Sequence, residues 1–434
     1  NGKPHTNVYY SFIRNRCHVE SGEVIDLAVK DGNIARMGQL DREVTKAVKV
    51  IDGKGNLISP PFVESHIHLD TVLSAGQPRW NESGLINEGI HIWAERKKDL
   101  TRADVIDRAT EVLRWQLAQG ILHVRSHIDI SDPNLTALNT LLEIREKMSP
   151  HMNIQIVAFP QEGIVSCAGN EERLEEALRL GADAVGAIPH GEYTREYGLK
   201  SLDICFKLAE KYDRMVNVTC DEVDDGNSRF IETVATKALE SGLGEKVTAS
   251  HVNAMALYDD AYVERLIGLI KAAKVNIISS PLISSVTQGR LGTYPKSRGL
   301  ARIKELWRAG VNVSLAHDDI ATPFYPLGTG NMLHASHMAV HLAHMNSPEE
   351  IDETFYMTTK RGAKTLQVER SYHLEEGNPA NFVILPVRSK YDAVRLQPVS
   401  QYVVSNGKVI CETPPVVSQL RLENQHYQCN YTFR

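Results

Sequence analysis

The sequence contains no apolar run long enough to span a membrane, for which roughly 18 consecutive apolar residues are needed. It has no excess of positive charge either, because 48 Lys and Arg face 54 Asp and Glu, and the net charge is -6. We therefore expect no membrane span and neither nucleic acid nor an anionic membrane as a partner. The Gly-x-Gly-x-x-Gly signature of a dinucleotide-binding open sheet is also missing after the first long apolar strand.

Cysteine is scarce and scattered. The six cysteines lie at positions 17, 167, 205, 220, 411 and 429, and no two of them form a Cys-x-x-Cys pair. This spacing provides neither a zinc-binding motif nor a redox motif. Because the first five residues also lack the apolar core of a signal peptide, we expect reduced thiols in a cytoplasmic protein.

Between residues 59 and 367 the sequence alternates between strand-like and helix-like segments. The predicted helices include 104–119 and 171–180, and each is followed by a glycine that suits a helix C-cap (Gly120 and Gly181). The predicted strands are 57–68, 121–130, 154–160, 183–189, 214–220, 246–251, 275–280 and 311–317. Eight strands that alternate with helices predict an α/β fold, a (β/α)8 TIM-type barrel.

The two ends of the chain are rich in strands instead. Asp31-Gly32 lies between two β-rich runs, and Asn406-Gly407 lies between two others, so both are predicted to be hairpin turns. We therefore expect residues 1–58 and 368–434 to form one small composite β-sandwich beside the barrel.

The catalytic end of such a barrel is the carboxyl end of its strands, so polar residues that close an apolar run are candidate site residues. The first strand ends in His66-Ile67-His68. Side chains two residues apart on a strand point the same way, so both imidazoles would face one point and could bind a divalent metal.

Other predicted strands also end in polar residues that could join this pair. Glu222, His251 and Asp318 close the fifth, sixth and eighth strands, and Gln161 follows the third. Because side chains alternate along a strand, His317 and Asp319 should point one way and Asp318 the other. At most one of these two directions faces the barrel centre. Further strand-end candidates are His127, Asp129, Glu162, His190 and Glu192.

Several of these motifs resemble bacterial cytosine deaminase, a branch of the amidohydrolase superfamily, and the resemblance runs in register from about residue 24 to 410. The motifs that carry it are Pro60-Pro61-Phe62-Val63-Glu64-Ser65-His66-Ile67-His68-Leu69-Asp70, Val157–Gly163, Cys220-Asp221-Glu222, Ala249-Ser250-His251 and His317-Asp318-Asp319.

The resemblance implies a role for each matching residue. His66, His68 and Asp318 would bind the metal, and Glu222 would move a proton from the attacking water to the ring nitrogen and the leaving ammonia. His251 would hydrogen-bond that water and the tetrahedral centre. Gln161, Asp319 and Phe324 would contact the substrate.

The resemblance also implies one divalent metal ion, Zn²⁺ or Fe²⁺, a small heterocyclic substrate and a homo-oligomer. Relatives that hold two metals use a lysine at the end of strand four, whereas this strand is followed by no lysine before Lys200.

One of the expected metal-ligand positions departs from the family. Thr219 stands where the family has a histidine ligand, and a neutral hydroxyl is a poor ligand for Zn²⁺ or Fe²⁺. Three explanations stay open: a weaker site with an added water, a pocket adapted to another ring, or a homologue that binds a ring without catalysis. An engineered change of His to Thr is a further possibility.

Gly191 and Phe324 replace a Phe and a Trp of the relatives, which favours a substrate other than plain cytosine.

We therefore expect a metal-dependent hydrolase that removes an exocyclic amino group from a cytosine-like or related nitrogen heterocycle and releases ammonia. The alternatives are a cyclic amide hydrolase or cyclase acting on a uracil-like ring, and a non-catalytic ring-binding protein with a degraded metal site.

Overall fold

Eight parallel strands form the centre of the computed structural model, which describes residues 9–18, 20–40 and 47–431. The strands pair in chain order, and a bridge between Ile67 and Asp318 joins the first strand to the segment after the last. They are β6 (Phe62–Ile67), β7 (Ile121–Asp129), β8 (Asn153–Phe159), β9 (Ala184–Ala187), β10 (Met215–Cys220), β11 (Val247–His251), β12 (Asn276–Ser279) and β13 (Val313–Leu315). The predicted barrel is confirmed.

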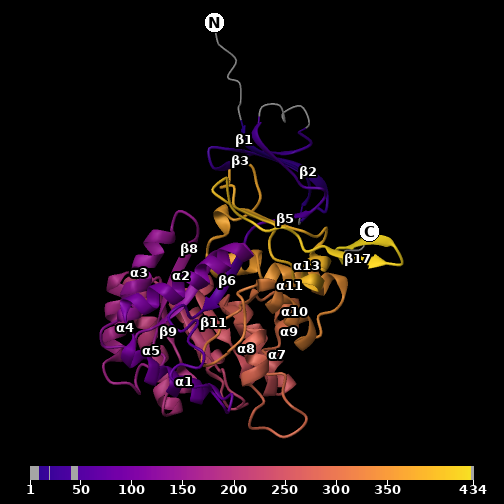
Figure 1. Cartoon of the computed structure of the whole chain (residues 1–434). Coiled ribbons are helices and arrows are strands. Elements are labelled where there is room, and N and C mark those ends of the chain that lie inside the picture. The colour runs from indigo at the N-terminus through magenta and orange to yellow at the C-terminus, as the bar shows by residue number, and fades with distance from the viewer. Residues whose placement is uncertain (1–8, 19, 41–46, 432–434) are drawn as a thin grey trace.

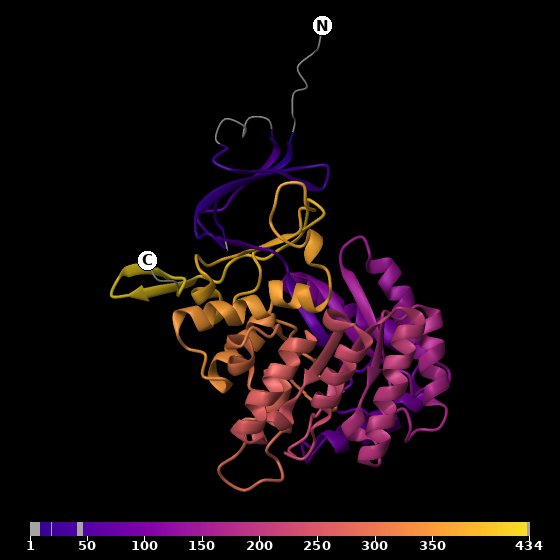
Figure 2. The same cartoon turned by 180° about the vertical axis from the view of Figure 1, so that it is seen from behind.

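Helices surround this barrel, as the pictures from both sides show (Figure 1 and Figure 2). Gly120 and Gly181 end two of them with φ of 93° and 116°, a left-handed conformation that glycine adopts without a steric penalty. The longer helices are α1 (Ile86–Arg96), α2 (Arg102–Gln119), α3 (Thr136–Met148), α4 (Asn170–Leu180), α5 (Arg195–Tyr212), α6 (Phe230–Ser241), α7 (Asp260–Ala273), α10 (Met332–Leu342) and α11 (Pro348–Met357). The shorter helices are α8 (Pro281–Thr287), α9 (Ile303–Arg308), α12 (Lys360–Thr365) and α13 (Lys390–Leu396).

The single strand expected over 57–68 is two strands in different sheets. Pro60 and Pro61 separate β5 (Leu57–Ser59) from β6, because a proline lacks the N–H that a central strand donates to its neighbour. β5 pairs antiparallel with β14 (Phe382–Leu385) in the sheet built from both ends of the chain.

That second sheet lies at the top of Figure 1, beyond the barrel. Both predicted hairpins are present in it, and Asn406 and Gly407 have φ of 48° and 75°, as a tight turn of this type requires. The strands besides β5 and β14 are β1 (Tyr9–His18), β2 (Val24–Lys30), β3 (Asn33–Gly38), β4 (Ala47–Asp52), β15 (Tyr402–Ser405) and β16 (Lys408–Glu412). Residues 1–8, 19, 41–46 and 432–434 of the expected terminal domain lie outside the described residues.

A last hairpin follows, β17 (Ser418–Leu422) with β18 (Gln425–Cys429), which projects from the side of the molecule (Figure 1). The sequence contained no clear signal for it. In the described part of the chain, no helix combines the length and the apolar character needed to cross a membrane.

One half-buried histidine near the amino end of a barrel strand, away from the carboxyl ends, makes stability depend on pH. Desolvation lowers the pKa of His123 on β7 to about 4, and its Nδ1 has no hydrogen-bond partner among the described residues. Below pH ~6.5 the unfolded chain therefore binds a proton at His123. The folded chain binds that proton only when the pH approaches the lowered pKa of about 4. Stability should fall as the pH drops through this window, by at most about 3 kcal/mol from this group.

We expect His123→Asn to reduce the loss of melting temperature between pH 7 and pH 5, measured by circular dichroism. His151→Asn is the matched control, since His151 is exposed. An unchanged pH dependence in His123→Asn would contradict this explanation.

Candidate active site

Three atoms that could bind a metal ion lie close together where the first and last barrel strands end. The Nε2 atoms of His66 and His68 lie 3.2 Å apart, and each lies 3.6 Å from Oδ1 of Asp318. Zn²⁺ binds imidazole nitrogen and carboxylate oxygen at roughly 2.0–2.2 Å, so neighbouring ligands of a tetrahedral ion lie about 3.4 Å apart. The three measured distances are close to this spacing, and the arrangement therefore fits a divalent cation.

The carboxylate of Asp318 supports the same conclusion. Both of its oxygens are buried, and neither has a hydrogen-bond partner among the described residues. Burial and then the neighbouring acids Asp319, Glu222 and Glu64 raise the pKa of Asp318 well above its ordinary value. A buried carboxylate that accepts no hydrogen bond is costly without a compensating charge, and a bound cation would supply one.

A hydrogen bond fixes the orientation of the His66 ring. Its Nδ1 lies 2.8 Å from Oγ of Ser250, which also accepts a hydrogen bond from the side-chain amide of Asn217. The ring of His127 stacks on that of His66 with centroids 3.6 Å apart. With Nδ1 engaged and one ring face covered, Nε2 of His66 is directed toward Asp318, as in many metal-binding histidines.

Glu64 holds the two strand ends together, a role that the sequence did not reveal. Its carboxylate accepts backbone hydrogen bonds from His317 at 3.0 and 3.2 Å and from His66 at 3.4 Å. Burial raises its pKa to about 8. The only available signal was an acidic residue inside an otherwise apolar run.

The expected alternation of side chains after β13 is wrong. The strand ends at Leu315, and Asp318 has a φ of 74°, so the backbone there is no longer extended. Asp318 and Asp319 consequently both line the same cavity, while Nδ1 of His317 contacts the backbone oxygen of Asp319 at 3.0 Å. The two carboxylates lie together because the chain leaves the strand conformation.

Glu222 and His251 also lie close to Asp318. Nδ1 of His251 is 3.7 Å from Oε1 of Glu222, and its Nε2 is 3.5 Å from Oδ2 of Asp318. Burial, followed by the charge of Asp319, raises the pKa of Glu222 to about 8. A carboxyl group with such a pKa can hold or release a proton near neutral pH, which is what a general acid and base requires.

A small cavity lies above these groups. Gln161, Asp319 and Phe324 line it, as does Thr219, so the predicted substrate-contacting residues do face one space. Apolar side chains that the sequence did not single out complete the wall, namely Ile86, Phe159, Ile188 and Ile283.

Other candidates at the strand ends serve the fold instead. Asp129 accepts hydrogen bonds from Lys97 and Trp93 at 2.9 and 3.0 Å, and Lys97 also pairs with Glu162. Glu192 accepts hydrogen bonds from the backbone of the loop after β8, including that of Ile164 at 2.6 Å. The hydrogen bonds and ion pairs of these carboxylates therefore involve neither His66 nor Asp318.

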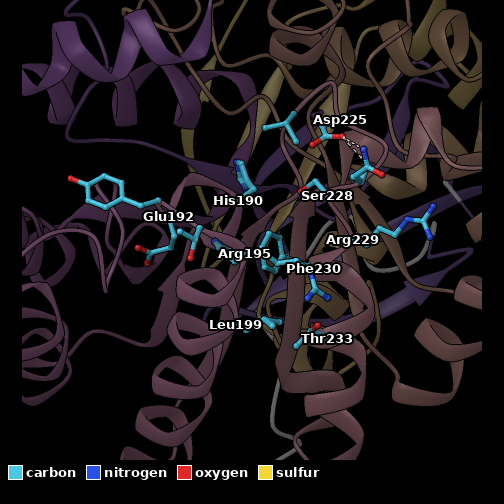
Figure 3. A pocket seen from close by; sticks show the side chains of 14 residues that line it. His190, Glu192, Arg195, Leu199, Asp225, Ser228, Arg229, Phe230 and Thr233 are labelled. Atoms are coloured by element: carbon cyan, nitrogen blue, oxygen red, sulfur yellow. Dashed lines mark hydrogen bonds between the residues drawn. The ribbon is translucent and has the colours of Figure 1, made fainter.

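His190 and Glu192 line a different hollow, between the segments that follow β9 and β10 (Figure 3). None of the residues predicted to bind the metal or the substrate lines this hollow. Gly191 is exposed and lines neither space, so its difference from the relatives does not reshape the substrate cavity directly.

The comparison with known proteins agrees with this geometry. The model of the amidohydrolase family matches residues 49–411, most of the chain. The chain belongs to the amidohydrolase family. A solved structure of 5-methylcytosine deaminase from Klebsiella pneumoniae is 42% identical, with a TM-score of 0.90, over 93% of this chain and 98% of that one. This similarity supports the cytosine-deaminase-like branch that the motifs indicated.

Two curated relatives are more distant. The N-isopropylammelide isopropyl amidohydrolase of Pseudomonas sp. strain ADP is 27% identical over 94% of this chain and 98% of its own length. The pterin deaminase of Rhizobium rhizogenes is 26% identical over 91% of this chain and 90% of its own length. The prediction of an amidohydrolase enzyme is thus confirmed.

Proposed function

We propose that this amidohydrolase removes the exocyclic amino group of a cytosine-like pyrimidine, with 5-methylcytosine the first substrate to test. The observation that carries the proposal is the grouping of Gln161, Glu222 and Asp319 in one cavity beside His66, His68 and Asp318. The 42% identity with a 5-methylcytosine deaminase supports the choice of ring.

The proposed reaction adds water to the carbon that bears the amino group and releases ammonia, leaving a carbonyl. A divalent metal, Zn²⁺ or Fe²⁺, held by His66, His68 and Asp318 would supply a nucleophile at neutral pH by lowering the pKa of bound water from ~15.7 to ~7. Glu222 takes one proton from the attacking water and delivers it to the ring nitrogen. It then takes the hydroxyl proton of the tetrahedral carbon and passes it to the amino group, which leaves as ammonia as the carbonyl forms. The raised pKa of Glu222 suits both steps.

The cavity walls provide recognition. The side-chain amide of Gln161 can both donate to and accept from the amide edge of a pyrimidine, and Asp319 can accept a hydrogen bond from a ring N–H. Phe324 offers an aromatic face against which a flat ring can pack.

Ammonia release tests the proposal. The protein is incubated with Zn²⁺ or Fe²⁺ and with cytosine, 5-methylcytosine, isocytosine, isoguanine or creatinine in turn, and ammonia is measured over time. We expect release from a cytosine-like ring. No release from any of the five by metal-loaded protein would contradict the proposal, and ring opening of a uracil-like compound without ammonia would favour the cyclic amide alternative.

Helix α1 sets the position of Phe324. A Cβ atom added at Gly89 would lie 2.6 Å from Cδ1 of Phe324, closer than carbon atoms pack. We therefore expect Gly89→Ala to displace the Phe324 ring and to raise KM for the substrate about tenfold, with the metal content unchanged. Gly268→Ala on α7 is the matched control, because no atom lies within 4 Å of its added Cβ. An unchanged KM in Gly89→Ala would show that Phe324 does not contact the substrate.

A further inference from the structure

The metal-binding group lacks the imidazole that position 219 would contribute in the family. Thr219 is buried on β10, and its Oγ1 has no hydrogen-bond partner among the described residues. A neutral hydroxyl competes poorly with imidazole for Zn²⁺ or Fe²⁺. His66, His68 and Asp318 supply three ligands, so a fourth protein ligand has to come from another strand or be replaced by solvent.

The neighbouring strand provides an imidazole at this place. In the register between β10 and β11, Thr219 pairs with Ser250 and Cys220 pairs with His251. His251 has a φ of 75°, a conformation that is costly for a residue other than glycine and that is retained mainly at functional sites. The backbone thus turns at the end of β11, one residue beyond the level of Thr219.

We infer that His251 is a metal ligand in this chain and takes the place of the absent strand-five histidine. His66, His251 and Asp318 are all buried and bring ligand atoms to within 4.8 Å of one another. Nε2 of His251 lies 3.5 Å from Oδ2 of Asp318, close to the spacing of roughly 3.4 Å between ligands of one tetrahedral ion.

Two other histidines near the site, His127 and His190, do not join this group. The ring of His127 stacks on His66 at 3.6 Å and so lies beside that ring. The ring of His190 hydrogen-bonds to the backbone of Thr219 and lines the hollow shown in Figure 3. Among the described residues, the imidazole nitrogens within 4 Å of the Asp318 carboxylate are those of His66, His68 and His251.

This inference rests on the proposed metal-dependent function but is tested without a substrate. X-ray absorption spectroscopy of the Zn²⁺-loaded protein counts the imidazoles bound to the metal. We expect three in the protein as it is and two in His251→Asn. A count of two in the unchanged protein would overturn the inference, whether or not the protein releases ammonia from any ring.

Zn²⁺ affinity, measured by competition with a chromophoric chelator, gives a second readout. Loss of a residue that only supports a ligand typically lowers metal affinity by roughly 10- to 100-fold. We expect His251→Asn to lose more than about 100-fold, and His190→Asn, the control beside Thr219, to lose less. A smaller loss in His251→Asn would overturn the inference. Melting curves of the metal-free variants check that each one folds.

A rescue experiment separates the two positions. If His251 replaces the missing ligand, Thr219→His should restore tight Zn²⁺ binding and the count of three imidazoles in the His251→Asn background. If Thr219→His restores neither the Zn²⁺ affinity nor the third imidazole in that background, a histidine at position 219 cannot replace His251 as a ligand, and the inference fails.

Discussion

Glu222→Gln is expected to reduce ammonia release by roughly 10²- to 10⁴-fold, the usual contribution of a general acid and base. Gln has nearly the same shape as Glu but cannot take up a proton from water and pass it to the leaving amine. Burial and the charge of Asp319 raise the pKa of Glu222 to about 8, so the native group can serve both steps near neutral pH. The measurement is the initial rate of ammonia formation at saturating substrate.

Metal content distinguishes a lost proton carrier from a damaged site. Glu222 lies 3.7 Å from His251 but outside the group formed by His66, His251 and Asp318, so Glu222→Gln should keep its metal. Glu264→Gln, on the exposed side of α7, is the matched control and should keep full activity. A fully active Glu222→Gln would show that another group moves the proton.

Asp318→Asn is expected to have opposite effects on metal binding and on the stability of the metal-free protein. The charge of Asp318 is buried beside Asp319, Glu222 and Glu64, all of which raise its pKa. Removing it relieves this repulsion, so the melting temperature of the metal-free protein should rise. The same change removes the anionic ligand, and Zn²⁺ affinity and ammonia release should both fall by at least about 10³-fold.

Asp319→Asn is the matched control for this prediction. Asp319 is equally buried and lines the same cavity, but it does not belong to the group of converging ligand atoms. We expect Asp319→Asn to keep its metal and to lose substrate affinity. If Asp318→Asn binds Zn²⁺ as tightly as the unchanged protein, Asp318 is not a ligand.

The barrel could be predicted from the sequence because its signals are local. A buried parallel strand is a short apolar run, and a helix often ends at a glycine, so both appear within ten or so residues. The division of the expected strand 57–68 was missed although its cause is also local. Pro60 and Pro61 break the pairing there, and β5 joins the sheet formed by the ends of the chain.

The candidate site was predicted only as a set of strand ends. His66 and His68 follow from the two-residue period of a strand, and their converging Nε2 atoms agree with that prediction. Asp318 and Asp319 do not follow from it, because the backbone changes conformation at Asp318 and places both carboxylates in one cavity. No sequence period encodes such a local departure.

By itself, the sequence determined the eight-stranded barrel, the histidine pair and the cytosine-deaminase-like motifs, since each depends on residues close together in the chain. Only the tertiary structure decided which distant side chains meet. It separated Asp129 and Glu192, which bind Lys97 and a loop backbone, from His251, which approaches Asp318. The physical reason is that closing the barrel brings together strand ends that are far apart in the chain. Only the distances at that point show which side chains are close enough to bind the same metal ion.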